Sequence, residues 1–124
     1  MEKYILTILI TFSIIRVNAQ QKHGWEPFLY QLCEMEDVET DVCESYYDML
    51  CDFEANPMNI NTATRDELEA FPFLTSKDVE DISEYIYLHG PMKSLGELAM
   101  ISDLDYYKRR LLFYFTYAGE VRKR

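Results

Sequence analysis

Residues 58–75 of this chain, MNINTATRDELEAFPFLT, decide the fold. They include Thr64-Arg65-Asp66-Glu67, the pattern of a capping box, in which the threonine oxygen accepts the backbone N–H three residues later and the glutamate reaches back. Pro72 disfavours a helical conformation in the residue before it. The sequence therefore predicts a short helix that begins after Thr64 and ends at about Phe71, followed by a tight turn.

Similar start and stop signals continue towards the C-terminus. Thr75 or Ser76 can cap a helix that ends at His89-Gly90-Pro91, because glycine suits a left-handed helix end and proline cannot continue the helix. Ser94-Leu95-Gly96-Glu97 is a second capping box and predicts another short helix. Asp105 can cap a last helix. The pattern is four helices and no convincing strand, which predicts an all-α fold.

Two tight turns separate these helices, at residues 72–75 and 102–105. Each turn has one apolar residue at its centre, Leu74 in the first and Leu104 in the second.

The N-terminus has the features of a signal peptide over residues 1–19. Residues 5–15 form an apolar run of eleven residues, shorter than the roughly 20 needed to span a bilayer. Val17-Asn18-Ala19 then places small residues at a cleavage position before Gln20. We expect an exported protein of the periplasm or outer cell envelope, without a stable transmembrane segment after cleavage.

Residues 20–56 form an acidic lead-in, with ten acidic residues against one lysine. Apolar residues recur at helical spacing and predict two short helices separated by the acidic stretch 36–41. The two helices could pack as an antiparallel hairpin or against the block that follows. The chain as a whole has a net charge of −10, although its tail, residues 118–124, is basic. Such a field repels nucleic-acid phosphate and favours basic partners or cations, and it also suits a solvated surface.

The three cysteines all lie in the lead-in. Cys43 and Cys51 are eight residues apart, about 12 Å on a single helix, which is too far for a disulfide. Cys33 must therefore take part in any pair, with Cys43 or with Cys51. Three small buried residues are the alternative.

Four segments carry a likeness to a known family: residues 58–68, 71–72, 87–91 and 95–98. Together they resemble the helix-hairpin-helix region of ComEA-type competence proteins. This resemblance implies a tandem helix-hairpin-helix domain over residues 57–117, in which Leu74 and Leu104 plug into the core. The acidic lead-in also looks like the start of long bacterial envelope proteins, which implies a short or truncated relative.

In that family, glycines in the hairpin turns bring backbone N–H groups close to DNA phosphates. This chain has Phe73 and Thr75 in the first turn, and Asp103 and Asp105 in the second, where the family has glycines. Side chains obstruct the close approach, and a carboxylate at a helix N-terminus takes the place of a phosphate. The turns therefore keep their structural role, but they no longer give a reason to expect an anion-binding site.

We favour a non-enzymatic protein-interaction or structural module, whose partner is an envelope protein or the remainder of a longer protein. The alternative is ComEA-like binding of the double-stranded DNA backbone, without sequence specificity. Its candidate residues surround the two helix starts: Thr75, Ser76, Lys77, Lys108 and Arg109.

We do not expect an enzyme. The two histidines, His23 and His89, form no histidine–glutamate metal motif, and the chain has no phosphate loop. No histidine lies near a cysteine in the sequence, so zinc ligation is not expected. We therefore expect no metal, cofactor or small-molecule substrate.

Overall fold

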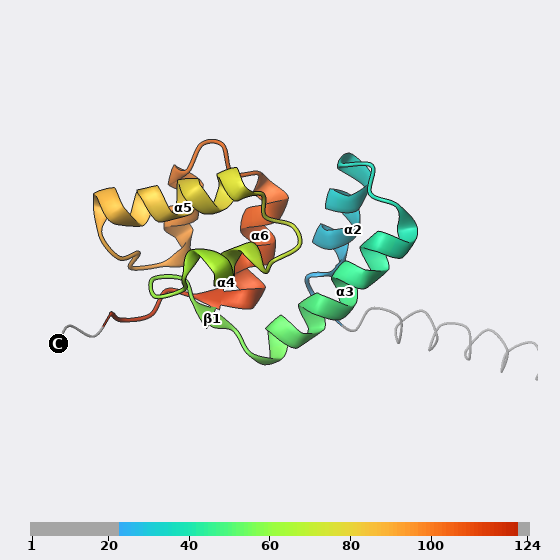
Figure 1. Cartoon of the computed structure of the whole chain (residues 1–124), viewed down its shortest axis with the longest axis horizontal. Helices are drawn as coiled ribbons and strands as arrows, with labels where there is room; N and C mark the ends of the chain where they lie inside the picture. The colour runs from blue at the N-terminus through green and yellow to red at the C-terminus, as the bar shows by residue number, and fades with distance from the viewer. Residues whose placement is uncertain (1–22, 122–124) are drawn as a thin grey trace, which may run out of the picture.

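The computed structural model describes residues 23–121, so the signal peptide predicted over residues 1–19 lies outside the described residues. The acidic lead-in forms two helices, α2 (Glu26–Met35) and α3 (Thr40–Ala55). A proline in the first turn of α2 favours helix initiation there. Helix α3 folds back beside α2 (Figure 1), after a turn in which Asp37 has a φ of 54°. The two predicted helices are thus present.

The block that follows contains three α-helices, one 3₁₀-helix and two very short strands. They are β1 (Met58–Asn59), α4 (Arg65–Glu69), α5 (Ser76–His89), η1 (Leu95–Met100), α6 (Tyr106–Phe115) and β2 (Thr116–Tyr117). Each start signal acts as predicted: Thr64 and Ser94 head capping boxes, and Asp105 accepts a backbone N–H of α6. At α5 the cap is Thr75, and Gly90 follows its last residue with a φ of 81°.

The expectation of an all-α chain without strands is correct for most of the described residues and wrong at the two ends of this block. Strand β1 pairs with β2 in parallel, with Met58 opposite Thr116 and Asn59 opposite Tyr117. The Asn59 side-chain oxygen accepts the Gly119 N–H at 3.0 Å, which holds the chain extended after α6. The segment that begins with Ser94-Leu95-Gly96-Glu97 forms a 3₁₀-helix and not an α-helix. A helix of only one or two turns between two caps can close with the tighter hydrogen bonds of the 3₁₀ form.

One hydrophobic core joins the lead-in to the block. Helix α6 buries Leu111, Leu112 and Phe115 completely, and it lies between α5 and the α2–α3 pair (Figure 1). Trp25, also fully buried, brings its ring centroid to 5.4 Å from that of Phe115. The lead-in therefore forms a hairpin and also packs against the block, so both of the predicted arrangements are present.

The central residues of both tight turns are buried, as expected. Leu74 is 8% exposed and Leu104 is 4% exposed. Within residues 23–121, no helix has the length and apolar character needed to cross a membrane.

Candidate functional site

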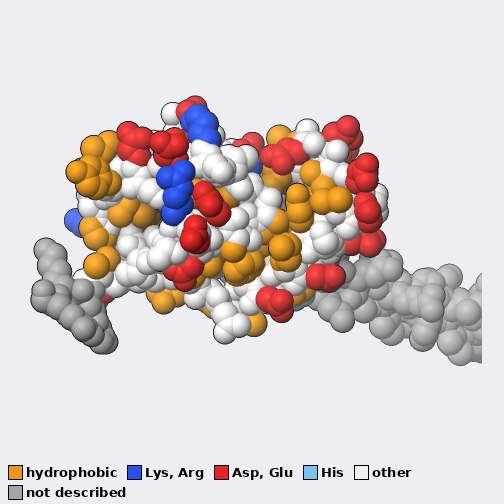
Figure 2. Space-filling model, viewed as in Figure 1, with side chains coloured by type: hydrophobic (Ala, Val, Ile, Leu, Met, Phe, Trp, Pro, Cys, Tyr) orange, Lys and Arg blue, Asp and Glu red, His pale blue; other side chains and the backbone are white. Residues whose placement is uncertain are grey.

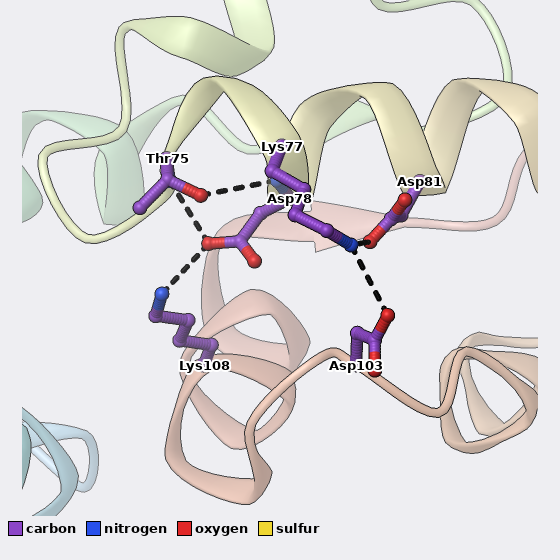
Figure 3. Close-up of polar contacts among 6 residues, drawn as sticks. All are labelled: Thr75, Lys77, Asp78, Asp81, Asp103 and Lys108. Atoms are coloured by element: carbon purple, nitrogen blue, oxygen red, sulfur yellow. Dashed lines mark hydrogen bonds and ion pairs between the residues drawn. The ribbon is translucent and has the colours of Figure 1, made fainter.

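The carboxylate of Asp78, in the first turn of α5, closes the first tight turn. Thr75 accepts the backbone N–H of Asp78 at 3.1 Å, and Asp78 Oδ2 accepts the backbone N–H of Thr75 at 2.9 Å (Figure 3). Free N–H groups at a helix N-terminus are what bind a phosphate. Here the carboxylate of Asp78 already takes one of them and contributes a negative charge, so the turn offers little to an external anion.

Lys108 is the second partner of this carboxylate. Its Nζ donates to Asp78 Oδ2 at 2.7 Å (Figure 3). The same Nζ lies 3.7 Å from Glu36 Oε1. The side chain is only 9% exposed. Burial alone would raise the pKa of Asp78, but the hydrogen bonds from Lys108 and Thr75 outweigh it and lower that pKa. Lys108, a candidate DNA contact, is therefore buried, and its ion pairs connect α6 to α5 and to the end of α2.

Lys77 is exposed but is also paired with carboxylates. Its Nζ lies 2.9 Å from Asp81 Oδ2 and 3.1 Å from Asp103 Oδ2 (Figure 3). Hydrogen bonds to Asp81 and to Asp103 raise the pKa of Lys77, so the group stays charged. Since Asp103 belongs to the second tight turn, this ion pair links the start of α5 to that turn. Of the remaining candidates in the first turn, Thr75 is the cap and Ser76 is the exposed first residue of α5.

Arg109 differs from the two lysines, and its neighbour Arg110 was not among the predicted site residues. The Arg109 guanidinium carbon lies 5.8 Å from the Tyr106 ring centroid. That of Arg110 lies 5.2 Å from the Phe28 centroid and 5.4 Å from the Phe113 centroid. Within the described part of the chain, neither arginine forms an ion pair, and the Nε of each is buried without a hydrogen-bond partner.

These arginines border a pocket of about 250 Å³ between α6 and η1. We call it the α6–η1 pocket; its lining residues are Gly96, Leu98, Ala99, Tyr106, Arg109, Arg110 and Phe113. Small-molecule sites usually have volumes of about 300–1,000 Å³, so this pocket is on the scale of a side chain. The aromatic rings hold the guanidinium groups in place by cation–π contacts. The pocket was not predicted from the sequence, although the aromatic and arginine-rich composition of α6 was a usable signal.

The chain as a whole is acidic, with a net charge of −10. Figure 2 shows acidic side chains along the edge formed by α2 and α3 and around α5. Against this background, a pocket with two arginines and no carboxylate among its lining residues is unusual.

The cysteines form one disulfide and leave one thiol. Cys33 and Cys43 are bonded, with their Cα atoms 6.3 Å apart, which is one of the two predicted pairings. Cys51 is free and half-buried. No histidine is near a cysteine in the sequence, but the fold brings His23 Nε2 to 3.8 Å from Cys51 Sγ. The turn between α2 and α3 brings together residues that are 28 positions apart in the chain.

No family model, curated protein or solved structure matches this chain. The described residues thus form a small, largely helical protein with two tight turns and a pocket lined by arginine and aromatic residues. Its overall charge is negative.

Proposed function

We propose that this chain is an exported, non-enzymatic module of helix-hairpin-helix type that binds a partner protein in the bacterial cell envelope. The α6–η1 pocket would be its contact surface. The single observation that carries the proposal is the pair Arg109 and Arg110, which stack on aromatic rings and have no carboxylate partner among the described residues.

The composition of the pocket fits a protein partner. Tyrosine, phenylalanine and arginine are enriched in protein interfaces, and a few such residues provide most of the binding energy. Tyr106 is 52% exposed and Phe113 is 39% exposed, so both rings are open to a partner. Two guanidinium groups above an apolar floor favour an acidic segment that also carries an apolar side chain.

The helix-hairpin-helix assignment and export rest on other features. Four helices with the predicted caps and two turns with buried central leucines are compatible with the ComEA-type resemblance. The disulfide between Cys33 and Cys43 is of the kind that persists in oxidising compartments outside the cytosol.

ComEA-like DNA binding is the alternative, and the site geometry weakens it. A phosphate would have to displace Asp78 from the first turn and compete with Asp81 and Asp103 for Lys77. The chain also has a net charge of −10, which opposes the approach of a polyanion.

A titration followed by nuclear magnetic resonance can separate these two functions. The probes are an acidic peptide of alternating glutamate and phenylalanine, the same peptide with lysine for glutamate, and a short DNA duplex. We expect the acidic peptide alone to give saturable shifts at Gly96 and Phe113, and Arg109→Gln with Arg110→Gln to abolish them. Lys93→Gln is the matched control, because Lys93 is exposed and does not line the pocket.

The proposal fails if both peptides shift the same residues equally, or if neither does. Saturable shifts with DNA at low salt, centred on Ser76 and Lys77, would instead support the alternative.

A further inference from the structure

Three side chains around Cys51 form a connected group, apart from the α6–η1 pocket. His23 Nε2 lies 3.8 Å from Cys51 Sγ, and His23 Nδ1 lies 2.7 Å from Glu54 Oε1. The second oxygen of Glu54 accepts the indole N–H of Trp25 at 2.9 Å. A carboxylate 2.7 Å from Nδ1 favours the neutral tautomer with its proton on Nδ1, which leaves Nε2 free to accept the thiol proton.

The imidazole is also held in place by rings on two sides. It stacks on Trp25 with centroids 5.0 Å apart and planes 25° apart, and Tyr47 meets it at 5.8 Å and 72°. Trp25 is fully buried and part of the core, so this support is rigid. A thiol beside a base that is oriented by a third group is the arrangement of an activated nucleophile.

We propose that Cys51 is a thiol–disulfide exchange site, that His23 accepts its proton, and that its partner is a disulfide carried on a positively charged molecule. The proton moves from Sγ to Nε2, and Glu54 stabilises the resulting imidazolium. The thiolate then attacks one sulfur of the partner disulfide. A bond forms between Cys51 and that sulfur, the partner's S–S bond breaks, and the departing thiolate takes the proton from His23.

The charges around the thiol determine which partner it takes. Burial is the first cause that raises the pKa of the Cys51 thiol, followed by the nearby carboxylates. The charged and titratable groups that face it are Glu54, Asp48 and Asp52 on α3, Glu26 and Tyr30 on α2, Tyr47 on α3, and His23. A thiol in this field stays protonated unless a base removes its proton. The same field attracts cationic disulfides and repels anionic ones.

The test measures second-order rate constants on the purified protein with its Cys33–Cys43 disulfide intact. The probes are cystamine, which is cationic, hydroxyethyl disulfide, which is neutral, and dithiodiglycolate, which is anionic. Mass spectrometry places the adduct, and Cys51→Ser must abolish it. At low salt we expect cystamine to react at least about tenfold faster than dithiodiglycolate, with the ratio falling as salt is added.

His23→Gln tests the proton acceptor with the neutral disulfide. We expect its rate near pH 7 to fall by at least about tenfold, and its pH profile to become the single rise of an isolated thiol. His89→Gln is the matched control and should react like the parent, because His89 lies at the end of α5. Circular dichroism of Trp25 checks the fold, and Glu54→Gln provides a second variant, which should slow the reaction less.

Three results would overturn the proposal. They are equal rates for the parent and His23→Gln, equal rates for the cationic and anionic disulfides, and reaction of Cys51 only after denaturation. If His23→Gln unfolds, the pH profile of the parent decides, because a thiol without a base rises only towards high pH and shows no plateau near neutrality.

Discussion

Three consecutive basic residues on α6 have two different environments. Lys108 is buried against Asp78 and near Glu36, whereas Arg109 and Arg110 contact aromatic rings and no carboxylate among the described residues. Successive helix residues point about 100° apart, so a short basic run reaches several neighbours. Lys108 ties α6 to the first tight turn, and the arginines border the α6–η1 pocket. The difference shows that the number of basic residues does not indicate how many can bind a ligand.

Replacing Lys108 is expected to have the largest effect. Lys108→Met keeps most of the side-chain volume but leaves the Asp78 carboxylate buried without its cation. Breaking a buried pair in this way costs about 3 kcal/mol of unfolding free energy. Urea denaturation followed by Trp25 fluorescence measures it.

Arg110→Met is the control for this comparison, since it removes a neighbouring charge that has no carboxylate partner within residues 23–121. We expect its unfolding free energy to stay within about 1 kcal/mol of the parent. Equal losses in the two variants would show that Lys108 and Arg110 play the same part, which contradicts the distinction.

Acid should act through the same pair. Because the folded pKa of Asp78 is lowered, its contribution to stability is complete above its unfolded pKa of about 3.9 and is lost as the pH falls through the folded value. In Lys108→Met, burial without the cation favours the protonated form of Asp78. Protonating this carboxyl as the pH falls should then restore part of the lost stability, so the difference in unfolding free energy between the two proteins should narrow in acid. Urea denaturation at a series of pH values from 7 to 2 compares the two proteins. Identical pH dependence would show that Asp78 does not depend on Lys108.

The sequence predicted the features that depend on near neighbours. The capping boxes at Thr64 and Ser94 and the cap at Asp105 involve residues no more than three positions apart, so the local pattern contains the whole interaction. The burial of Leu74 and Leu104 was expected from the resemblance to helix-hairpin-helix regions, in which the apolar residue at the centre of each turn packs into the core.

The features it missed join distant parts of the chain. Lys108 and Asp78 are 30 positions apart, and His23 and Cys51 are 28 apart. The β1–β2 pairing spans most of the block, and two-residue strands are too short to show alternation. Such contacts depend on how the helices pack, and neither residue of a pair carries a local signal for its partner. Lys108 was a candidate DNA contact in the alternative hypothesis, and its burial was missed because the charge of a residue does not indicate whether it is buried.

The smallest expected effect concerns Lys77, which differs from both cases: it is exposed, whereas Lys108 is buried and the arginines are half-buried, and it is paired with carboxylates as Lys108 is. Asp81→Asn with Asp103→Asn would free its Nζ and remove two negative charges beside the first turn. We expect no saturable DNA binding by the parent in an anisotropy titration at low salt, and weak, salt-sensitive binding by the double variant. Adding Lys77→Gln should remove that binding, whereas adding Lys93→Gln should leave it. Binding that survives Lys77→Gln would mean that the loss of negative charge, and not the release of this lysine, is what matters.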